Sequence, residues 1–144
     1  MGTPYERDVV AWAMEQAALL RAGKLSAIDI EHIADEIEDV AKSEKRELAR
    51  RVSELLAHLL RWQHQPGRRC SSWILSIKVQ RKSIASVLHE APSLTTSLTD
   101  ARWVEGTWHD AVAKAIDETE LDAFPGDCPW SIDQVLSAAF FPEA

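Results

Sequence analysis

The stretch HLLRWQHQPGRRCSSW, residues 58–73, joins two amphipathic runs through a Pro-Gly turn and decides the expected fold. Apolar residues recur at helical spacing on both sides of Pro66-Gly67, which is a strong turn signal. Two amphipathic helices joined by so short a turn pack antiparallel. We therefore predict a central antiparallel helical hairpin that turns at 66–67. Its register brings Trp62 and Trp73 together across the seam and places Glu54 near Arg81.

The helix before the turn extends back to about Ser26, because Ser26 and Asp29 together resemble a helix start. The spacing of its apolar residues predicts a face that packs against other helices. This stripe consists of Ile30, Ile33, Ile37, Val40, Leu48, Val52, Leu55, Leu59 and Trp62. The residues leave open whether the helix is continuous over 26–65 or broken near 41–44. In the continuous case Glu44 lies in the middle of the stripe and needs a partner.

Another helix is expected at the beginning of the chain. Thr3 is a good N-cap, Pro4 suits the first helical position, and Glu6 completes a capping box. Gly23 marks the end of this helix, because glycine is favoured just after a C-terminus.

Three helices follow the turn. One covers about 69–90, a second runs from about Leu94 to Leu121, and Ser131 with Gln134 forms a capping box for a short last helix. No strand pattern or repeat is present. The sequence therefore predicts a single all-α domain, residues 1–144: a compact helical bundle of four main helices with a short C-terminal helix.

Charge is distributed unevenly along the chain. Residues 25–47 carry eight acids against three bases, and residues 48–90 carry eight bases against two acids. Residues 91–144 return to ten acids against two bases. A basic middle between acidic flanks indicates either an anionic partner or complementary charges on packed helices. The net charge of −7 argues against broad affinity for nucleic acids.

The expected compartment follows from the cysteines and the first residues. Cys70 and Cys128 stand outside any CxxC or Cys-His spacing, which favours free thiols in a reducing environment. The segment MGTPYERDVV lacks the basic start and long apolar run of an export signal. No apolar run is long enough for a membrane span. We expect a cytoplasmic protein that makes no contact with membranes.

The sequence resembles the domain of unknown function 29 family of bacterial proteins. The matching segments are YERDVVAWAMEQAALLRAG at 5–23, DIEHIADEIEDV at 29–40, SEKREL at 43–48, HLLRWQHQP at 58–66, SWILSI at 72–77, APSL at 91–94, and FPGDCPW with a terminal FFP. The resemblance covers nearly the whole chain. It implies a small all-helical protein with no established activity, so no catalytic residue is carried over.

The turn region supplies the candidate binding residues. His58, Trp62 and Gln65 are spaced i, i+4, i+7, which places them on one helix face. Arginine and aromatic side chains beside them can stack on a partner, while histidine and glutamine form directional hydrogen bonds. The candidates are His58, Arg61, Trp62, His64, Gln65, Arg68, Arg69 and Trp73. The alternative is a polar corner that only ties the hairpin together.

Two catalytic interpretations have weaker support. Possible metal ligands on the acidic face are Glu31, His32, Asp35, Glu36 and Asp39. They lack the Glu-x-x-His motif and a matching set on a second helix, so a solvated face is favoured. Arg51 and His58 have the spacing of a helical ribonuclease, but the motif is short. Nucleophile-elbow, phosphate-loop and dinucleotide motifs are absent from the sequence.

The sequence does not determine a biochemical activity. Our first hypothesis is a non-enzymatic interaction module of a bacterial cytoplasmic system, which binds a protein partner or itself around residues 58–73. The alternative is a small RNA- or DNA-binding protein, or a ribonuclease, that uses the basic hairpin 48–90. A metal-dependent hydrolase built on residues 29–39 is a weaker alternative. We assign no catalytic residue, cofactor or metal ligand.

Overall fold

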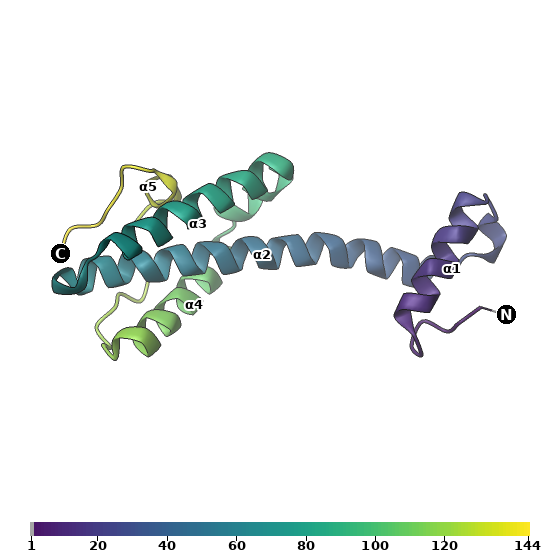
Figure 1. Ribbon diagram of the computed structural model, residues 1–144, viewed down its shortest axis with the longest axis horizontal. Helices are drawn as coiled ribbons and strands as arrows, with labels where there is room; N and C mark the ends of the chain where they lie inside the picture. The colour runs from purple at the N-terminus through teal and green to yellow at the C-terminus, as the bar shows by residue number, and fades with distance from the viewer. Residues whose placement is uncertain (1) are drawn as a thin grey trace. The chain divides into compact units, whose positions relative to one another are not determined.

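The computed structural model describes residues 2–144 and confirms the all-α prediction, with no strand among these residues (Figure 1). The α-helices are α1 (Val9–Arg21), α2 (Ile30–His64), α3 (Ser71–Glu90), α4 (Ala101–Thr119) and α5 (Ile132–Leu136). The 3₁₀ helices are η1 (Leu25–Ala27), η2 (Pro66–Arg68) and η3 (Pro92–Thr99). The four main helices and the short C-terminal helix are thus as predicted. The chain divides into two compact units, 1–44 and 45–144, and the single-domain assignment stays a prediction.

Helix α2 settles the question that the sequence left open near 41–44. It is continuous from Ile30 to His64, without a break near 41–44. The helix begins later than predicted, because η1 and an extended Ile28 precede it. The carboxylate of Asp29 caps its first turn by accepting a hydrogen bond from the His32 N–H at 3.3 Å. Glu44 is exposed and needs no buried partner.

The start of α1 differs from the prediction. Asp8, rather than Thr3, is the N-cap, and its side chain accepts a hydrogen bond from the Ala11 N–H at 3.1 Å. Thr3 is occupied elsewhere: its N–H and hydroxyl donate to the two carboxylate oxygens of Glu15 at 2.7 and 2.9 Å. Pro4 therefore lies in a turn before the helix. The C-terminal end agrees with the prediction, because Gly23 follows the helix with a φ of 72°.

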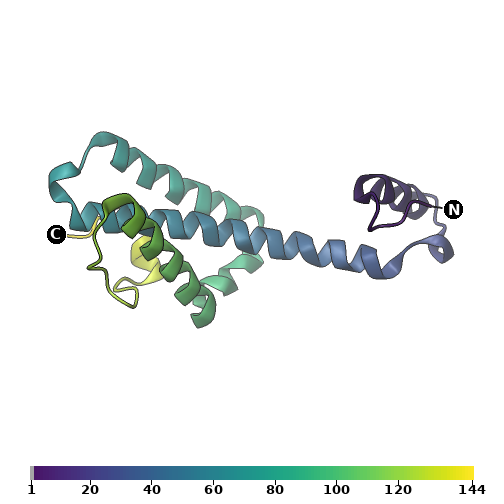
Figure 2. The same ribbon diagram turned by 90° about the horizontal axis from the view of Figure 1, so that it is seen from below.

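The first unit, up to residue 44, contains α1, η1 and the beginning of α2 (Figure 2). Asp29 organises it. Its carboxylate accepts a hydrogen bond from the indole N–H of Trp12 at 3.0 Å. Its backbone N–H donates to the side-chain oxygen of Gln16 at 2.7 Å. Both partners lie on α1, so these two bonds fix α1 against the start of α2.

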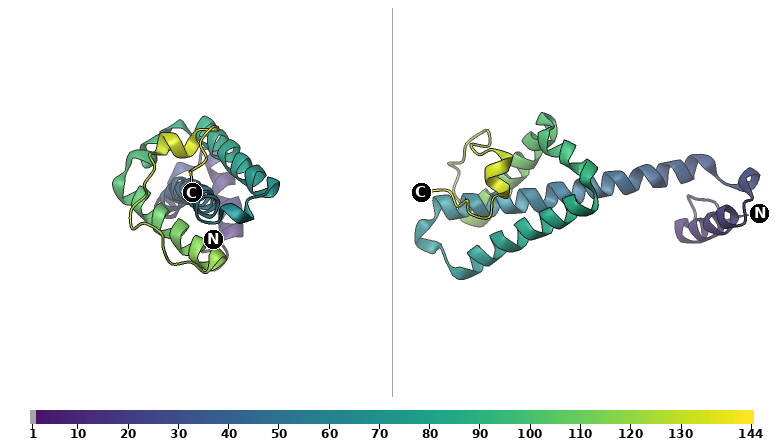
Figure 3. Two further views of the ribbon diagram at one scale, coloured as in Figure 1. Left: turned by 90° about the vertical axis from the view of Figure 1, so that its left-hand side faces the viewer. Right: turned by 90° about the horizontal axis from the view of Figure 1, so that it is seen from above.

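The second unit, from residue 45 on, has the C-terminal part of α2 at its centre, with α3, α4 and α5 around it (Figure 3). This arrangement follows from the apolar stripe of α2, which is buried here from Leu48 to Leu59. The buried core contains Leu48, Val52, Leu55, Leu56, Leu59, Leu60, Ile77, Ile84, Leu94, Leu98, Trp108, Ala111, Ala115 and Val135. Burial of these side chains provides most of the driving force for folding of this unit.

The central hairpin is antiparallel as predicted (Figure 1), but the predicted pairing of Glu54 with Arg81 does not form. Glu54 accepts a hydrogen bond from the side-chain amide of Gln80 at 2.8 Å, not from Arg81. One residue corresponds to about 100° around a helix. The predicted facing of Glu54 and Arg81 is therefore wrong.

The fourth predicted helix, 94–121, is shorter than expected. Its first part is η3, in which threonine hydroxyls donate to backbone carbonyls three residues earlier. Asp100 then caps α4 by accepting a hydrogen bond from the Trp103 N–H at 3.0 Å. The predicted capping box of the last helix is confirmed, with Ser131 and Gln134 bonded reciprocally.

Candidate interaction surfaces

The eight predicted binding residues lie together at the end of α2, along η2 and at the start of α3. Two of the three arginines among them, Arg61 and Arg69, are engaged within the chain. Arg61 forms an ion pair with Glu118 at 2.6 Å, and its guanidinium lies 4.7 Å from the centre of the Trp73 ring. Arg69 donates to the carbonyl of Trp62 at 2.8 Å and lies 4.6 Å above the ring of the same residue. These contacts bind the two arms of the hairpin to each other.

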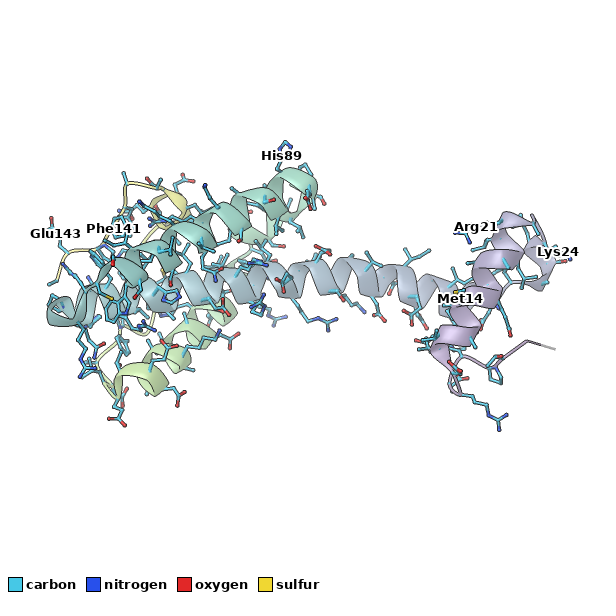
Figure 4. The ribbon with its side chains drawn as sticks, viewed as in Figure 1. Met14, Arg21, Lys24, His89, Phe141 and Glu143 are labelled. Atoms are coloured by element: carbon cyan, nitrogen blue, oxygen red, sulfur yellow. The ribbon has the colours of Figure 1, made fainter. Side chains whose placement is uncertain are left out.

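Contrary to our prediction, the indole rings of Trp62 and Trp73 do not pack against each other. The Trp62 ring packs against Phe141 at 5.0 Å, and the Trp73 ring lies under Arg61. Phe141 and Glu143 lie beside the end of α2 (Figure 4). Guanidinium groups occupy the ring faces, with Arg61 over Trp73 and Arg69 over Trp62. An aromatic side chain from the C-terminal segment covers Trp62 instead.

The remaining corner residues have less contact with α3. The ring of His64 packs edge-on against Phe124 at 4.8 Å. The backbone of Gln65 continues the helix into the turn by accepting a hydrogen bond from the Arg68 N–H at 3.0 Å. The side chain of Arg68 is exposed. The corner therefore ties the hairpin together, and its role in binding a partner stays a prediction.

A polar cluster links α2, α3 and α4 one to three turns before the corner. Its centre is the carboxylate of Glu54, which accepts hydrogen bonds from Arg50 at 3.1 Å, Gln80 at 2.8 Å and Lys114 at 3.4 Å. His58 lies one turn further along α2, and its Nδ1 is buried without a hydrogen-bond partner. Burial lowers the pKa of His58, and the nearby charge of Arg61 lowers it further. His58 is therefore held as a neutral imidazole inside the unit.

The basic character of residues 48–90 is largely satisfied within the chain. Five of its eight cations contact acids or backbone carbonyls. They are Arg50, Arg51, Arg61, Arg69 and Arg81. Arg51 pairs with Glu47 at 3.0 Å, so it is not directed at His58 as a ribonuclease pair. This pattern favours complementary charges on packed helices over an exposed anion-binding surface.

An aromatic and histidine cluster occupies the first unit, and the sequence analysis did not find it. His32 stacks on Tyr5 at 4.2 Å, and its Nδ1 contacts the Asp29 carboxylate at 2.7 Å. The hydroxyl of Tyr5 donates a hydrogen bond to Glu36. This bond is the main reason that the pKa of Tyr5 is raised to about 12. The i, i+3 spacing of Asp29 and His32 was the available signal.

The same contacts engage two of the proposed metal ligands of α2, His32 and Glu36. Hydrogen bonds to the aspartate raise the pKa of His32 above its ordinary value, which favours the imidazolium. Glu36 is an acceptor for a phenol. Within residues 2–144 no group of three or more histidine, cysteine, aspartate or glutamate side chains is placed to hold a metal ion.

Part of the apolar stripe of α2 is exposed, which corrects the expectation that all of it faces other helices. Ile30, Ile37 and Val40 are 67%, 65% and 65% exposed. On α1, Val10 and Met14 are 70% and 72% exposed, and Met14 is marked in Figure 4. A groove of about 310 Å³ lies between α1 and α2, lined by alanines, isoleucines and the edge of Trp12.

A second apolar surface lies on α3. Leu75 and Val79 are 62% and 49% exposed, one helical turn apart. They line a groove of about 510 Å³ together with Lys78, Lys82 and Leu136. The apolar floor and the two exposed ammonium groups give this surface a character opposite to that of the acidic α2 face.

The cysteines are free, as the sequence predicted, with Cys70 exposed and Cys128 half-buried. In the described part of the chain, none of the helices combines the length and the apolar character needed to cross a bilayer.

Comparisons with known proteins identify a family without a function. No curated protein and no solved structure matches the chain. The model of one family, described as "Domain of unknown function DUF29", matches residues 4–141 of the 144-residue chain. The match covers nearly the entire chain, in agreement with the segments quoted above. The chain belongs to this family.

Proposed function

We propose that the chain is a non-enzymatic interaction module of a bacterial cytoplasmic system, and that it binds protein through the apolar side chains its two units leave exposed. The observation that carries the proposal is the surface of the first unit. Among residues 2–44 the only buried hydrophobic side chain is Trp12, at 4% exposed. Eight large apolar side chains of the same segment are exposed: Val9, Val10, Met14, Leu20, Leu25, Ile30, Ile37 and Val40.

Apolar surface left in water costs about 25 cal/mol per Å², so eight exposed side chains are an unfavourable arrangement for an isolated unit. Exposed apolar surface that gathers in a patch marks protein interaction sites on folded proteins, and Leu20, Ile37 and Val40 line one groove here. A segment of about 40 residues also buries too little surface to be stable by itself. A protein partner that covers α1 and the start of α2 removes both costs.

The corner at residues 58–73 is a second candidate surface. Arg68 and the outer edge of Trp73 are open to solvent there, while Arg61 and Arg69 are held by contacts within the chain. Because these contacts hold both guanidinium groups within the chain, the exposed apolar faces are the stronger candidates. The two free thiols support a reducing compartment.

A triple variant tests the proposal. Val10→Ser, Met14→Ser and Ile37→Ser together remove apolar surface without touching Trp12 or the Asp29 contacts. The matched control replaces three exposed polar residues of the same unit: Arg7→Ser, Lys24→Ser and Glu44→Ser. Each protein is examined for self-association by sedimentation velocity. Each is also examined for binders that co-purify from the native cell and are then titrated as purified proteins by calorimetry.

We expect the wild type and the control to bind with equal affinity and with a negative heat-capacity change, which indicates burial of apolar surface. The triple variant should lose binding. If the wild type is monomeric at every concentration and no purified binder titrates, the function is not protein interaction. Equal loss of binding in the variant and the control would also contradict the proposed surface.

A further inference from the structure

One face of α2 combines exposed apolar side chains with unpaired negative charge. Ile30 and Ile37 are each followed by a glutamate, Glu31 and Glu38, and the two glutamates are seven residues apart on one side of the helix. Neither carboxylate has a hydrogen-bond or ion-pair partner among residues 2–144. Residues 25–44 carry seven acids against one base, so the apolar strip lies in a strongly negative field.

The groove on α3 is the chemical complement of this face. Leu75, Lys78, Val79 and Lys82 have the spacing i, i+3, i+4, i+7 and therefore form one face of the helix. The two ammonium groups are exposed, and in the part of the chain that the structure describes they contact no acid. The apolar floor extends to Leu136 on α5. A groove of this kind accepts an amphipathic helix with apolar anchors and an acidic border.

We propose that the partner is a second copy of the chain, with the acidic apolar face of α2, residues 30–40, docked in the α3 groove of the other copy. The proposal rests on the proposed function above and names its partner. The isoleucines of one copy cover Leu75 and Val79 of the other. Glu31 and Glu38 reach the two lysines, which places opposite charges at the rim and apolar side chains at the centre.

A second copy fits both surfaces better than any other occupant. Each chain carries one acidic and one basic face, so the two complementary faces are always present in equal amounts. Pairing of two acidic faces, or of two basic grooves, is opposed by charge repulsion. A nucleic acid or an anionic membrane would match only the α3 groove, and the net charge of −7 repels both.

Charge reversal tests the proposal on the full chain. One variant carries Lys78→Glu with Lys82→Glu, and a second carries Glu31→Lys with Glu38→Lys. A control carries Asp110→Lys with Asp117→Lys, which changes the net charge by the same amount as the second variant but on an exposed face of α4. The mass of each protein is measured by sedimentation equilibrium over a wide range of concentrations, and its circular dichroism verifies that it is folded.

We expect the wild type and the control to rise above 16.1 kDa with concentration. Each reversed variant alone should show a dissociation constant at least about tenfold higher, because like charges then meet at the rim. A 1:1 mixture of the two variants should recover the association, since each then offers the face that the other lacks. Recovery in the mixture cannot arise from misfolding of either variant.

A wild-type mass of 16.1 kDa at every concentration would exclude the second copy. In that case, a purified partner protein that binds the wild type but not the Ile37→Ser variant would still support an interaction module. The two proposals therefore fail separately. Self-association that persists in both reversed variants, without any gain on mixing, would show that other surfaces join the copies and would overturn the docking faces.

Discussion

Glu54 on α2 accepts a 2.8 Å hydrogen bond from the side-chain amide of Gln80 on α3, and this contact records the register of the helical hairpin. One residue further along, the helical rotation carries Arg81 away from the seam. Its guanidinium donates to the backbone carbonyls of Val135 at 2.9 Å and Phe140 at 2.6 Å. The register of the hairpin thus determines which side chain holds the C-terminal segment.

Replacement of Arg81 by alanine should destabilise the second unit by about 2–4 kcal/mol. The side chain is only 7% exposed, and its loss leaves the carbonyls of Val135 and Phe140 without their donors. Urea denaturation measures the change in the free energy of unfolding. The control is Arg68→Ala, an exposed arginine of the turn, which should change it by less than about 0.5 kcal/mol. Equal effects of the two substitutions would contradict this role of Arg81.

Two of the five tryptophans of the second unit, Trp62 and Trp108, should differ in their importance. Trp108 is 1% exposed and donates its indole N–H to the carbonyl of Pro125 at 3.1 Å, so Trp108→Ala should cost about 3–5 kcal/mol. Trp62 is only half-buried against Phe141, and Trp62→Ala should cost about 2 kcal/mol. Thermal unfolding of both variants checks the order. A larger loss for Trp62→Ala would show that the corner carries more of the core than the structure indicates.

Tyr5 gives a direct test of the first unit, because it is the only tyrosine of the chain. The hydrogen bond to Glu36 favours the neutral phenol, and the pKa of Tyr5 should lie near 12 instead of 10.0. The absorbance at tyrosinate wavelengths, followed against pH, gives the midpoint. Glu36→Gln should bring the midpoint back toward 10.0, whereas Glu38→Gln should leave it unchanged. A wild-type midpoint at 10.0 would mean that the contact does not form.

His32 and His58 should titrate on opposite sides of the ordinary pKa of 6.5. The Asp29 carboxylate raises the pKa of His32, and burial lowers that of His58. Nuclear magnetic resonance titration of the imidazole protons measures both, with His32→Asn and His58→Asn variants to assign the signals. Asp29→Asn should lower the midpoint of His32 and leave that of His58 in place. A midpoint for His58 above 6.5 would contradict its burial.

The two histidines also shift stability in opposite directions. Burial makes the pKa of His58 lower in the folded chain than in the unfolded chain, so the unfolded chain binds the proton more tightly. The free energy of unfolding should therefore fall as the pH drops below about 6.5. His32 contributes stability that is fully present below about 6.5 and is lost as the pH rises through its raised folded pKa. In His58→Asn, the free energy of unfolding should therefore change less with pH on the acid side. In His32→Asn, the free energy of unfolding should change less with pH on the alkaline side.

Local chemistry determined most of the secondary structure. The Pro66-Gly67 turn, the Gly23 terminus and the Ser131 capping box follow from backbone preferences of a few neighbouring residues, and all three are present. Thr3 shows the limit of such signals. It had the sequence of an N-cap, but Glu15, twelve residues away, satisfies its N–H and hydroxyl. A contact that distant competes with the local signal and is not visible in the sequence.

In the candidate site, too, the sequence shows what depends on neighbouring residues and not what depends on distant segments. The sequence correctly grouped the eight residues of the corner in one region, because they are close along the chain and share helix faces. It could not show that Phe141 covers Trp62 or that Glu118 holds Arg61, since both partners come from distant segments. It also gave one uniform stripe from Ile30 to Trp62, of which Leu48 to Leu59 is buried while Ile30 and Ile37 are exposed.

The sequence by itself therefore determined that this protein is helical, where its main turn lies and which family it belongs to, because these depend on short-range preferences and on residue identity. Only the tertiary structure decided the hairpin register, the partners of the arginines and the part of the apolar stripe that remains open. A periodic pattern specifies that a helix has an apolar face. Whether that face is covered depends on which distant segments reach it, and periodicity carries no information about them.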